Sequence, residues 1–140
     1  MIRSKPLPKD IEQRLAKAAA FLQSEPDVVF AYLFGGLAQR SRRPLSDVDI
    51  AVYLSDGCAG EAAKLHILGR LNDILETDEI DLVVLNQAPP ALTMNILRDK
   101  RLLADKAPPR RHQFESLAFR KYFDFLPIES AMLKRRVLYG

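Results

Sequence analysis

Two short stretches, separated by ten residues, decide how this chain folds: Leu33-Phe34-Gly35-Gly36 and Asp47-Val48-Asp49-Ile50-Ala51-Val52. The first ends an apolar run with a glycine pair, and the second begins an apolar run with two aspartates. Alternate residues of a strand point to the same face, so we expect Asp47 and Asp49 to project together. Aspartate is depleted in strands and like charges repel, so a divalent cation is the expected compensation.

A glycine turn and a third carboxylate complete the expected site. Gly35 and Gly36 precede a segment, 36–40, that we expect to be a short helix, and backbone N–H groups at such a turn can bind an anion. Asp81 lies in a third apolar run, 79–85, and can face the aspartate pair if this strand lies beside 47–54. Three carboxylates and phosphate oxygens could hold two Mg²⁺ ions, with Asp81 also acting as base for an attacking hydroxyl. The pattern predicts a pocket for a metal-bound nucleoside triphosphate; the simpler alternative is that each aspartate only caps its strand.

The hydrophobic periodicity predicts alternating helices and strands. We expect strands over 28–34, 47–54, 79–85 and 101–104, and helices over 9–23 and 61–75, from about 90, and from about 108 to 139. In the helix 61–75, the leucines expected to face inward are Leu65, Leu68, Leu71 and Leu75. Pro127 should break or kink the last helix. The mixture predicts a single α/β (α+β) domain over 1–140, with a central mixed sheet, flanking helices and a C-terminal helical segment from about 108.

Composition narrows the function classes. The chain has 140 residues, a formal net charge of +3 and one cysteine, so an internal disulfide is impossible and a reducing cytoplasm is the expected location. No apolar run is long enough for a transmembrane helix, and the N-terminus lacks the apolar core of a signal peptide. The mild basic excess does not predict direct nucleic-acid binding, because no extended basic channel is apparent. Of the clustered arginines, Arg40, Arg42 and Arg43 lie between the two halves of the motif.

Residues 34–38 and 46–52 resemble the minimal nucleotidyltransferases (MNT) of the DNA polymerase β superfamily, whose signature is Gly-Ser, ten residues, then Asp-x-Asp, with a third acid on a later strand. The spacing here matches without a gap, and the resemblance covers roughly residues 10 to 125. It implies a polymerase β-like nucleotidyltransferase fold. Gly36 stands where the family has serine, which removes a hydroxyl that would contact the triphosphate; one such hydrogen bond to a charged group contributes about 1.5–3 kcal/mol. Arg40 is a candidate to restore positive charge near the phosphates.

The resemblance also implies an activity and a partner. Family members transfer AMP from ATP to a hydroxyl, and in the toxin–antitoxin branch the acceptor is a tyrosine of a HEPN-domain ribonuclease toxin. The first hypothesis is therefore a Mg²⁺-dependent adenylyltransferase that acts as an antitoxin. The second is a module of the same fold, weakened by Gly36, that neutralises its partner by binding. The third is a nucleotidyltransferase for a small acceptor of the aminoglycoside type, for which 140 residues leave little room.

Several other side chains have simpler interpretations. Tyr32 and Tyr53 lie within apolar strands and are expected in the core, while His66 is expected to be partly buried and His112 exposed. The late apolar residues have two interpretations. The aromatic group near Phe114 either packs on its own domain or binds a partner, and the stripe after Pro127 could contact another subunit in a homo-oligomer or hetero-oligomer.

Overall fold

Four strands and four α-helices make up the computed structural model, which describes residues 10–35, 48–57 and 60–138, with side chains described to residue 124. In chain order the elements are α1 (Ile11–Ser24), β1 (Val28–Phe34), β2 (Val48–Leu54), α2 (Glu61–Leu75), β3 (Ile80–Val84), a 3₁₀ turn η1 (Leu85–Gln87), α3 (Pro90–Arg98), β4 (Arg101–Asp105) and α4 (Pro108–Leu138). The expected succession of helices and strands is therefore observed in these residues, with ends that differ by one or two positions.

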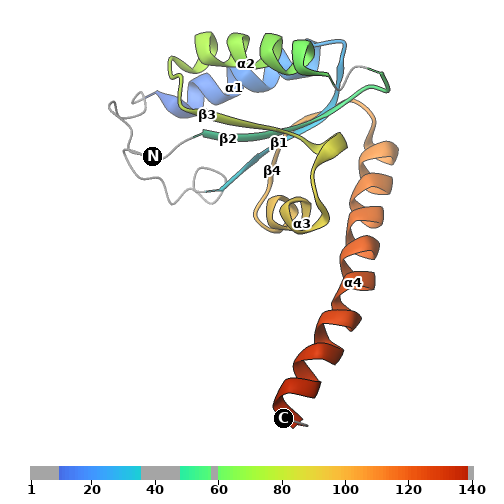
Figure 1. Ribbon diagram of the computed structural model, residues 1–140. Helices are drawn as coiled ribbons and strands as arrows, with labels where there is room; N and C mark the ends of the chain where they lie inside the picture. Colours follow the sequence, from blue (N-terminus) through green and yellow to red (C-terminus); the bar gives the residue numbers. More distant parts are fainter. Residues whose placement is uncertain (1–9, 36–47, 58–59, 139–140) are drawn as a thin grey trace.

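The strands form one mixed sheet in the order β3-β2-β1-β4. β1 lies at the centre and pairs antiparallel with both β2 and β4. β2 and β3 are parallel, and α2 makes the crossover that a parallel pair requires. This arrangement brings the end of β1 and the starts of β2 and β3 to the same end of the sheet, as Figure 1 shows.

Helices α1 and α2 cover one face of the sheet (Figure 1). The inward residues of α1 recur at helical spacing, and their side chains are fully buried: Ile11, Leu15, Ala18 and Leu22. They pack against alternate strand residues, including Leu33 of β1 and Ile50 of β2. This layer consists of aliphatic side chains, so burial of apolar surface is its main source of stability.

Helix α3 and the first turns of α4 pack on the opposite face. Its core contains an aromatic group in which the Phe30 ring stacks on Tyr53 at 4.8 Å between centroids and meets Phe114 of α4 at 5.5 Å. Phe114 therefore packs on its own domain, as one of the two interpretations of the late aromatic residues proposed. Tyr32 is fully buried, as expected for a core residue, and Tyr53 is half-buried.

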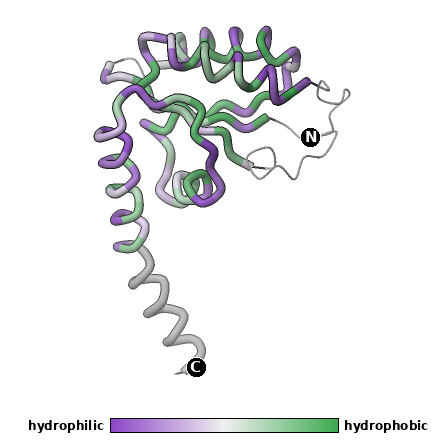
Figure 2. The backbone as a smooth tube through the Cα atoms, turned by 180° about the vertical axis from the view of Figure 1, so that it is seen from behind, coloured by the Kyte–Doolittle hydropathy of each residue, from purple (hydrophilic) through white to green (hydrophobic). Residues whose placement is uncertain are grey.

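Helix α4 has 31 residues, and its C-terminal half extends away from the sheet and the other helices (Figure 1). Its first turns carry both hydrophilic and hydrophobic residues, as the colours of Figure 2 show. Of the break or kink expected at Pro127, the break is wrong, because the helix continues through this residue to Leu138. Proline removes one backbone hydrogen bond, and the helical turns on both sides keep theirs. Within the described ranges, none of the helices combines the length and apolar character that a bilayer crossing requires.

Two side chains of α2 differ from the expected pattern. Leu65 is 63% exposed, and Ile67 is buried in its place together with Leu71 and Leu75. His66 is also exposed, with its Nε2 atom 3.6 Å from a carboxylate oxygen of Glu25. The leucine spacing alone did not fix the rotation of the helix, because Ile67 begins an alternative apolar stripe that includes Leu71 and Leu75.

Candidate active site

Gly35 follows β1 directly, and its backbone lies close to the side chain of Asp49 in β2. Its φ of +73° lies in the left-handed region, which favours glycine. A Cβ atom at this position would lie 2.4 Å from Oδ2 of Asp49 and 3.3 Å from its Cγ. The turn after β1 therefore packs directly on the Asp49 carboxylate, and both the backbone conformation and the available space require glycine.

Asp49 and Asp81 lie side by side on the parallel strands β2 and β3. They are register partners, and neighbouring strands lie about 4.8 Å apart. Paired residues share a face of the sheet. Asp49 alternates with the buried Val48 and Ile50, which face α1 and α2, so both carboxylates belong to the face covered further along by α3 and α4. Asp49 is half-buried and Asp81 is exposed.

This arrangement fits a hard divalent cation. Two carboxylates on adjacent strands repel each other, and oxygen ligands of this kind are those that Mg²⁺ binds. Within the described ranges no group of three acidic, histidine or cysteine side chains forms a complete metal site. Asp47, the remaining carboxylate of the expected site, lies outside these ranges, directly before Val48.

Half of the predicted site residues fall on the segment 36–47, outside the described residues: Gly36, Arg40 and Asp47. The structure does place the point at which this segment rejoins the sheet. The backbone N–H of Val48 donates to the carbonyl oxygen of Glu79 at 3.2 Å, at the start of the β2–β3 ladder. Of the predicted site, the structure thus brings together Gly35, Asp49 and Asp81.

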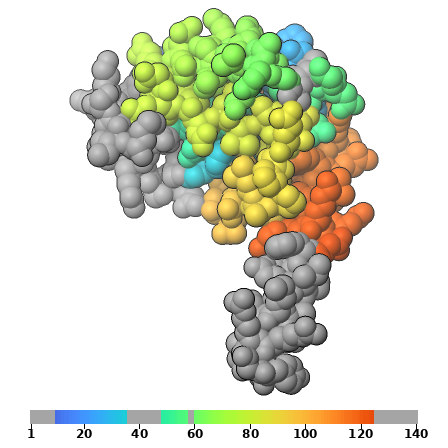
Figure 3. Space-filling view, in the orientation of Figure 1, coloured from blue at the N-terminus to red at the C-terminus, as the bar shows by residue number. Residues whose placement is uncertain are grey.

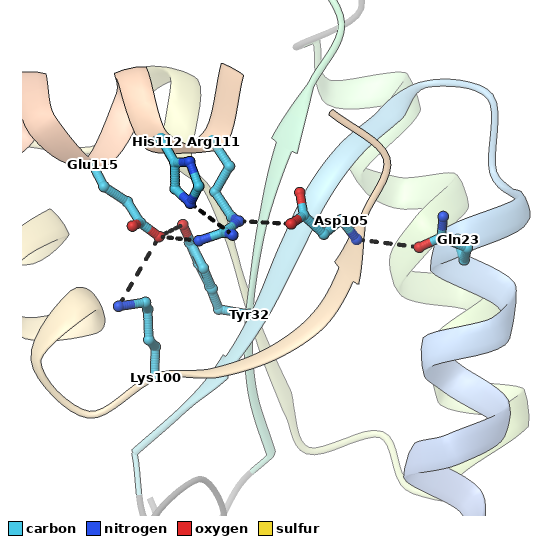
Figure 4. A network of polar contacts seen from close by, with 7 residues as sticks. All are labelled: Gln23, Tyr32, Lys100, Asp105, Arg111, His112 and Glu115. Atoms are coloured by element: carbon cyan, nitrogen blue, oxygen red, sulfur yellow. Dashed lines mark hydrogen bonds and ion pairs between the residues drawn. The ribbon is translucent and has the colours of Figure 1, made fainter. Parts of the chain in front are cut away.

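A polar network lies on the same face of the sheet, between β1 and α4 (Figure 4). The Tyr32 hydroxyl donates to Oε2 of Glu115 at 2.6 Å, and Arg111 donates to the same atom at 3.2 Å. Arg111 also binds Asp105 at 2.9 Å, and Lys100 lies 4.0 Å from Glu115. Burial, followed by the hydrogen bond to Glu115, raises the pKa of Tyr32 above its ordinary range.

This network fixes α4 to the sheet near the candidate site. Phe34 pairs with Asp49, and Tyr32 lies two residues earlier on β1, on the same face. Sequence reasoning placed Tyr32 in the core but missed its polar partners. The available signal was the spacing of Arg111 and Glu115, four residues apart on one helix, which predicts an ion pair on one helical face.

Two hollows border the sheet on this side. One, of about 490 Å³, follows the outer edge of β3 and includes Asp81. The other, of about 270 Å³, lies between β2, α3 and α4 and is lined by Tyr53, Phe114 and Lys121 among others. Tyr53 is four residues along β2 from Asp49, so only the first hollow adjoins the carboxylates.

The chain also matches a known protein family. The model of the polymerase beta nucleotidyltransferase family matches residues 16–108, about two thirds of the chain, and the chain belongs to this family. The match spans β1, β2 and β3, and so includes the glycine turn and all three aspartates. No curated protein matches the chain.

Solved structures show the same fold at low sequence identity. A toxin–antitoxin structure with AMP-PNP is 22% identical, with a TM-score of 0.70, and the match covers 90% of this chain and 98% of that chain. A structure of the tri-AMPylated Shewanella oneidensis HEPN toxin in complex with an MNT antitoxin is 20% identical, with a TM-score of 0.67, and the match covers 90% of this chain and 98% of that chain. A MntA-HepT toxin–antitoxin structure is 22% identical, with a TM-score of 0.65, and the match covers 89% of this chain and 98% of that chain. The expected polymerase β-like nucleotidyltransferase fold is thus confirmed, and the chain shares it with the structures of these toxin–antitoxin complexes.

Proposed function

We propose that this nucleotidyltransferase is a Mg²⁺-dependent adenylyltransferase that transfers AMP from ATP to a tyrosine of a HEPN-domain toxin and thereby acts as an antitoxin in the cytoplasm. The observation that carries the proposal is the contact between the Gly35 turn and Asp49, with Asp81 as the register partner of Asp49. A turn that only glycine fits, placed against paired carboxylates, supplies an anion-facing backbone and a cation site at the same end of one sheet.

The residues have distinct roles in this proposal. The turn at Gly35 and Gly36 faces the phosphates, with Arg40 adding positive charge. Asp47, Asp49 and Asp81 would hold Mg²⁺, which when bound neutralises phosphate charge and lowers the pKa of the attacking hydroxyl. Asp81, the exposed member, accepts the proton of that hydroxyl. The hydroxyl oxygen forms a bond to the α-phosphorus of ATP, the bond from that phosphorus to the bridging oxygen breaks, and pyrophosphate leaves.

The HEPN partner is supported by the structural neighbours and by helix α4. One neighbour is a tri-AMPylated HEPN toxin with its MNT antitoxin, and its antitoxin shares this fold. On α4, large apolar side chains are exposed at Leu117 (45%), Phe119 (40%) and Phe123 (57%). The rings of Phe119 and Phe123 stack at 6.3 Å. Phe119 and Phe123 lie four residues apart and so share one helical face, whereas Leu117 lies on another side of the helix beside the hollow that Phe114 lines. An exposed aromatic pair on a projecting helix is typical of a protein-binding surface, so α4 is the proposed contact for the toxin or for another subunit.

The decisive experiment compares wild type with Asp49→Asn. We expect calorimetric titration of ATP with Mg²⁺ to show binding by wild type, and the variant to lose it because one carboxylate at the cation site becomes neutral. AMP transfer to a HEPN toxin, followed by mass spectrometry of the acceptor tyrosine, should fall at least about 100-fold.

The matched control is Asp56→Asn. Asp56 is an exposed aspartate beyond the other end of β2, paired with Arg110 at 2.8 Å. The Asp56→Asn variant should bind Mg²⁺-ATP and transfer AMP as wild type does. Unchanged transfer in Asp49→Asn would contradict the proposed site.

A second candidate function is supported by one feature of the sequence. Gly36 lacks the hydroxyl that the resembling family uses toward the triphosphate, so the same fold could neutralise a toxin by binding alone. Gly36→Ser separates the two candidates. A gain in AMP transfer of tenfold or more, the equivalent of about 1.4 kcal/mol, would identify the natural site as degenerate, whereas little change would identify it as competent.

A further inference from the structure

Strand β3, which carries Asp81, lies at an edge of the sheet. No strand among the described residues pairs with its outer side. Edge strands with open backbone N–H and C=O groups are the places at which an extended peptide can join a sheet.

The hydrogen-bond pattern identifies the backbone groups of β3 that turn outward. Val48 donates to the carbonyl oxygen of Glu79, and in a parallel ladder the residues that bond the neighbouring strand alternate. Glu79, Asp81 and Val83 therefore direct their backbone groups toward β2. Ile80, Leu82 and Val84 direct theirs away from it, toward the open edge.

A groove follows this edge and reaches the candidate site. It has a volume of about 490 Å³, and its walls include β3 itself, Lys64 of α2 and Leu92 of α3. In Figure 3 the yellow-green atoms around residues 80–90 lie at the surface between the green α2 and the gold α3. Asp81 belongs both to this groove and to the carboxylate pair, so the groove opens directly onto the site.

The two sides of the carboxylate pair differ in access. On the β1 side, the Gly35 turn packs against Asp49 and is the proposed phosphate side. On the β3 side, no strand of the described ranges covers the edge, and Asp81 is exposed. An acceptor that approaches Asp81 without displacing the nucleotide therefore arrives along the β3 edge.

We propose that the outer edge of β3 binds the acceptor segment of the protein substrate as an added, extended strand, which places its tyrosine beside Asp81. This inference rests on the proposed function. A residue opposite Asp81 on an added strand has its side chain on the same face as Asp81, with Cβ atoms about 4.5–5.5 Å apart. Its phenol oxygen bonds to the α-phosphorus, its proton passes to Asp81, and pyrophosphate leaves as described above. The geometry accounts for a polypeptide acceptor in a chain of 140 residues, because the sheet itself supplies the acceptor site.

The probe is a pool of pentapeptides of the form acetyl-X-X-Tyr-X-X-amide, in which X is Val, Ile or Thr. Amide NMR of the wild-type chain with Mg²⁺-ATP should show slower exchange at Ile80, Leu82 and Val84 when the pool is added, and no change at Val83, whose N–H already faces β2. This readout reports docking whether or not AMP is transferred.

Alternate N-methylation of the peptides is the matched control. On an added strand only every second N–H faces β3, so methylating the tyrosine nitrogen and methylating its two neighbours should have opposite effects. One pattern should weaken binding at least tenfold and the other should leave it nearly unchanged, and the harmful pattern also reports whether the strand is parallel or antiparallel. Equal effects of the two patterns would overturn strand addition.

A protein variant gives an independent check. Val84 has a φ of −92° and an outward N–H, so Val84→Pro removes an edge donor that β2 does not use. Val84→Ala removes side-chain atoms and keeps the donor. Peptide binding should be at least tenfold weaker in the proline variant than in the alanine variant, and equal binding would contradict the proposal.

The remaining outcomes are also decisive. Protection of the outward amides without AMP transfer would support docking and reject the transfer activity. Protection that appears in the isolated chain as its concentration rises would show that the edge pairs with a second copy, and would overturn the proposal. Absence of protection by the pool at millimolar concentration would overturn it as well.

Discussion

The two faces of the sheet differ in what they contain. On the α1 and α2 face, the core is made of aliphatic side chains with almost no exposed surface. On the α3 and α4 face, the same strands present Asp49, Asp81 and Tyr32, with a partly buried polar network beneath α4. Because strand residues alternate between faces, each strand can contribute to stability on one side and to chemistry on the other.

The difference shows how a small domain can hold repelling carboxylates. Asp49 lies between Val48 and Ile50, both fully buried on the opposite face. Apolar burial contributes about 1.5–3 kcal/mol for each large side chain, which can offset the cost of placing two acids together. The carboxylates therefore stay in position before any cation or nucleotide binds. Substitutions on the two faces should separate stability from activity.

The largest effect on stability is expected from Leu71→Ala. Leu71 is fully buried in the aliphatic layer, and such truncations cost about 2–5 kcal/mol. Urea denaturation should show this loss. The control is Leu65→Ala on the same helix, which should change stability by less than about 0.5 kcal/mol because Leu65 is 63% exposed. Similar losses in both variants would contradict the observed rotation of α2.

Gly35→Ala should damage the candidate site and the fold together. The new Cβ would meet the Asp49 carboxylate, and the positive φ is unfavourable for alanine at about 1–2 kcal/mol. We expect AMP transfer to fall at least about tenfold, because displacement of a reacting group by 1 Å can cost a hundredfold.

Gly69→Ala is the control for that substitution. Gly69 lies within α2, and a Cβ there would meet nothing within 4 Å. It should leave activity unchanged and raise stability by up to about 1 kcal/mol, since alanine favours a helix. Wild-type activity in Gly35→Ala would show that the turn is not needed to position the Asp49 carboxylate.

Tyr32→Phe tests the polar face at neutral pH. The variant loses one hydrogen bond to Glu115, whereas the contacts of Glu115 with Arg111 and Lys100 remain. A loss of about 1–2 kcal/mol is expected from urea denaturation, smaller than that of Leu71→Ala. A loss above 3 kcal/mol would mean that the network, rather than aromatic packing, holds α4 to the sheet.

The same variant gives the smallest effect, a change in pH dependence. Burial raises the pKa of Tyr32, so the folded state keeps this proton where the unfolded state, with a pKa near 10, loses it. The stability of wild type is unaffected below pH 10 and falls above it, by up to about 1.4 kcal/mol for each pH unit. The difference in free energy of unfolding between wild type and Tyr32→Phe should therefore shift between pH 8 and pH 11. Over this interval, wild type should lose about 1.4 kcal/mol more stability than the variant. Parallel pH curves would show that Tyr32 titrates normally.

Most of the fold could be predicted from local patterns. The apolar runs predicted β1 over its full observed length, and the helical spacing predicted α2 with its observed bounds, Glu61 to Leu75. The rotation of α2 could not be predicted, because Leu65 and Ile67 begin competing apolar stripes and only packing against the sheet selects one. The expected break at Pro127 failed for a similar reason, since a local penalty for one hydrogen bond does not decide whether a helix of 31 residues continues.

The candidate site divides in the same way. The spacing from Gly36 to Asp47 and the alternation of Asp47 with Asp49 are properties of the sequence, because strand geometry fixes the face of alternate residues. The neighbouring position of Asp49 and Asp81, the contact of Gly35 with Asp49, and the bond from Tyr32 to Glu115 were decided only by the tertiary structure. Each joins segments whose proximity depends on which strands pair and where a helix docks, and no local periodicity specifies that choice.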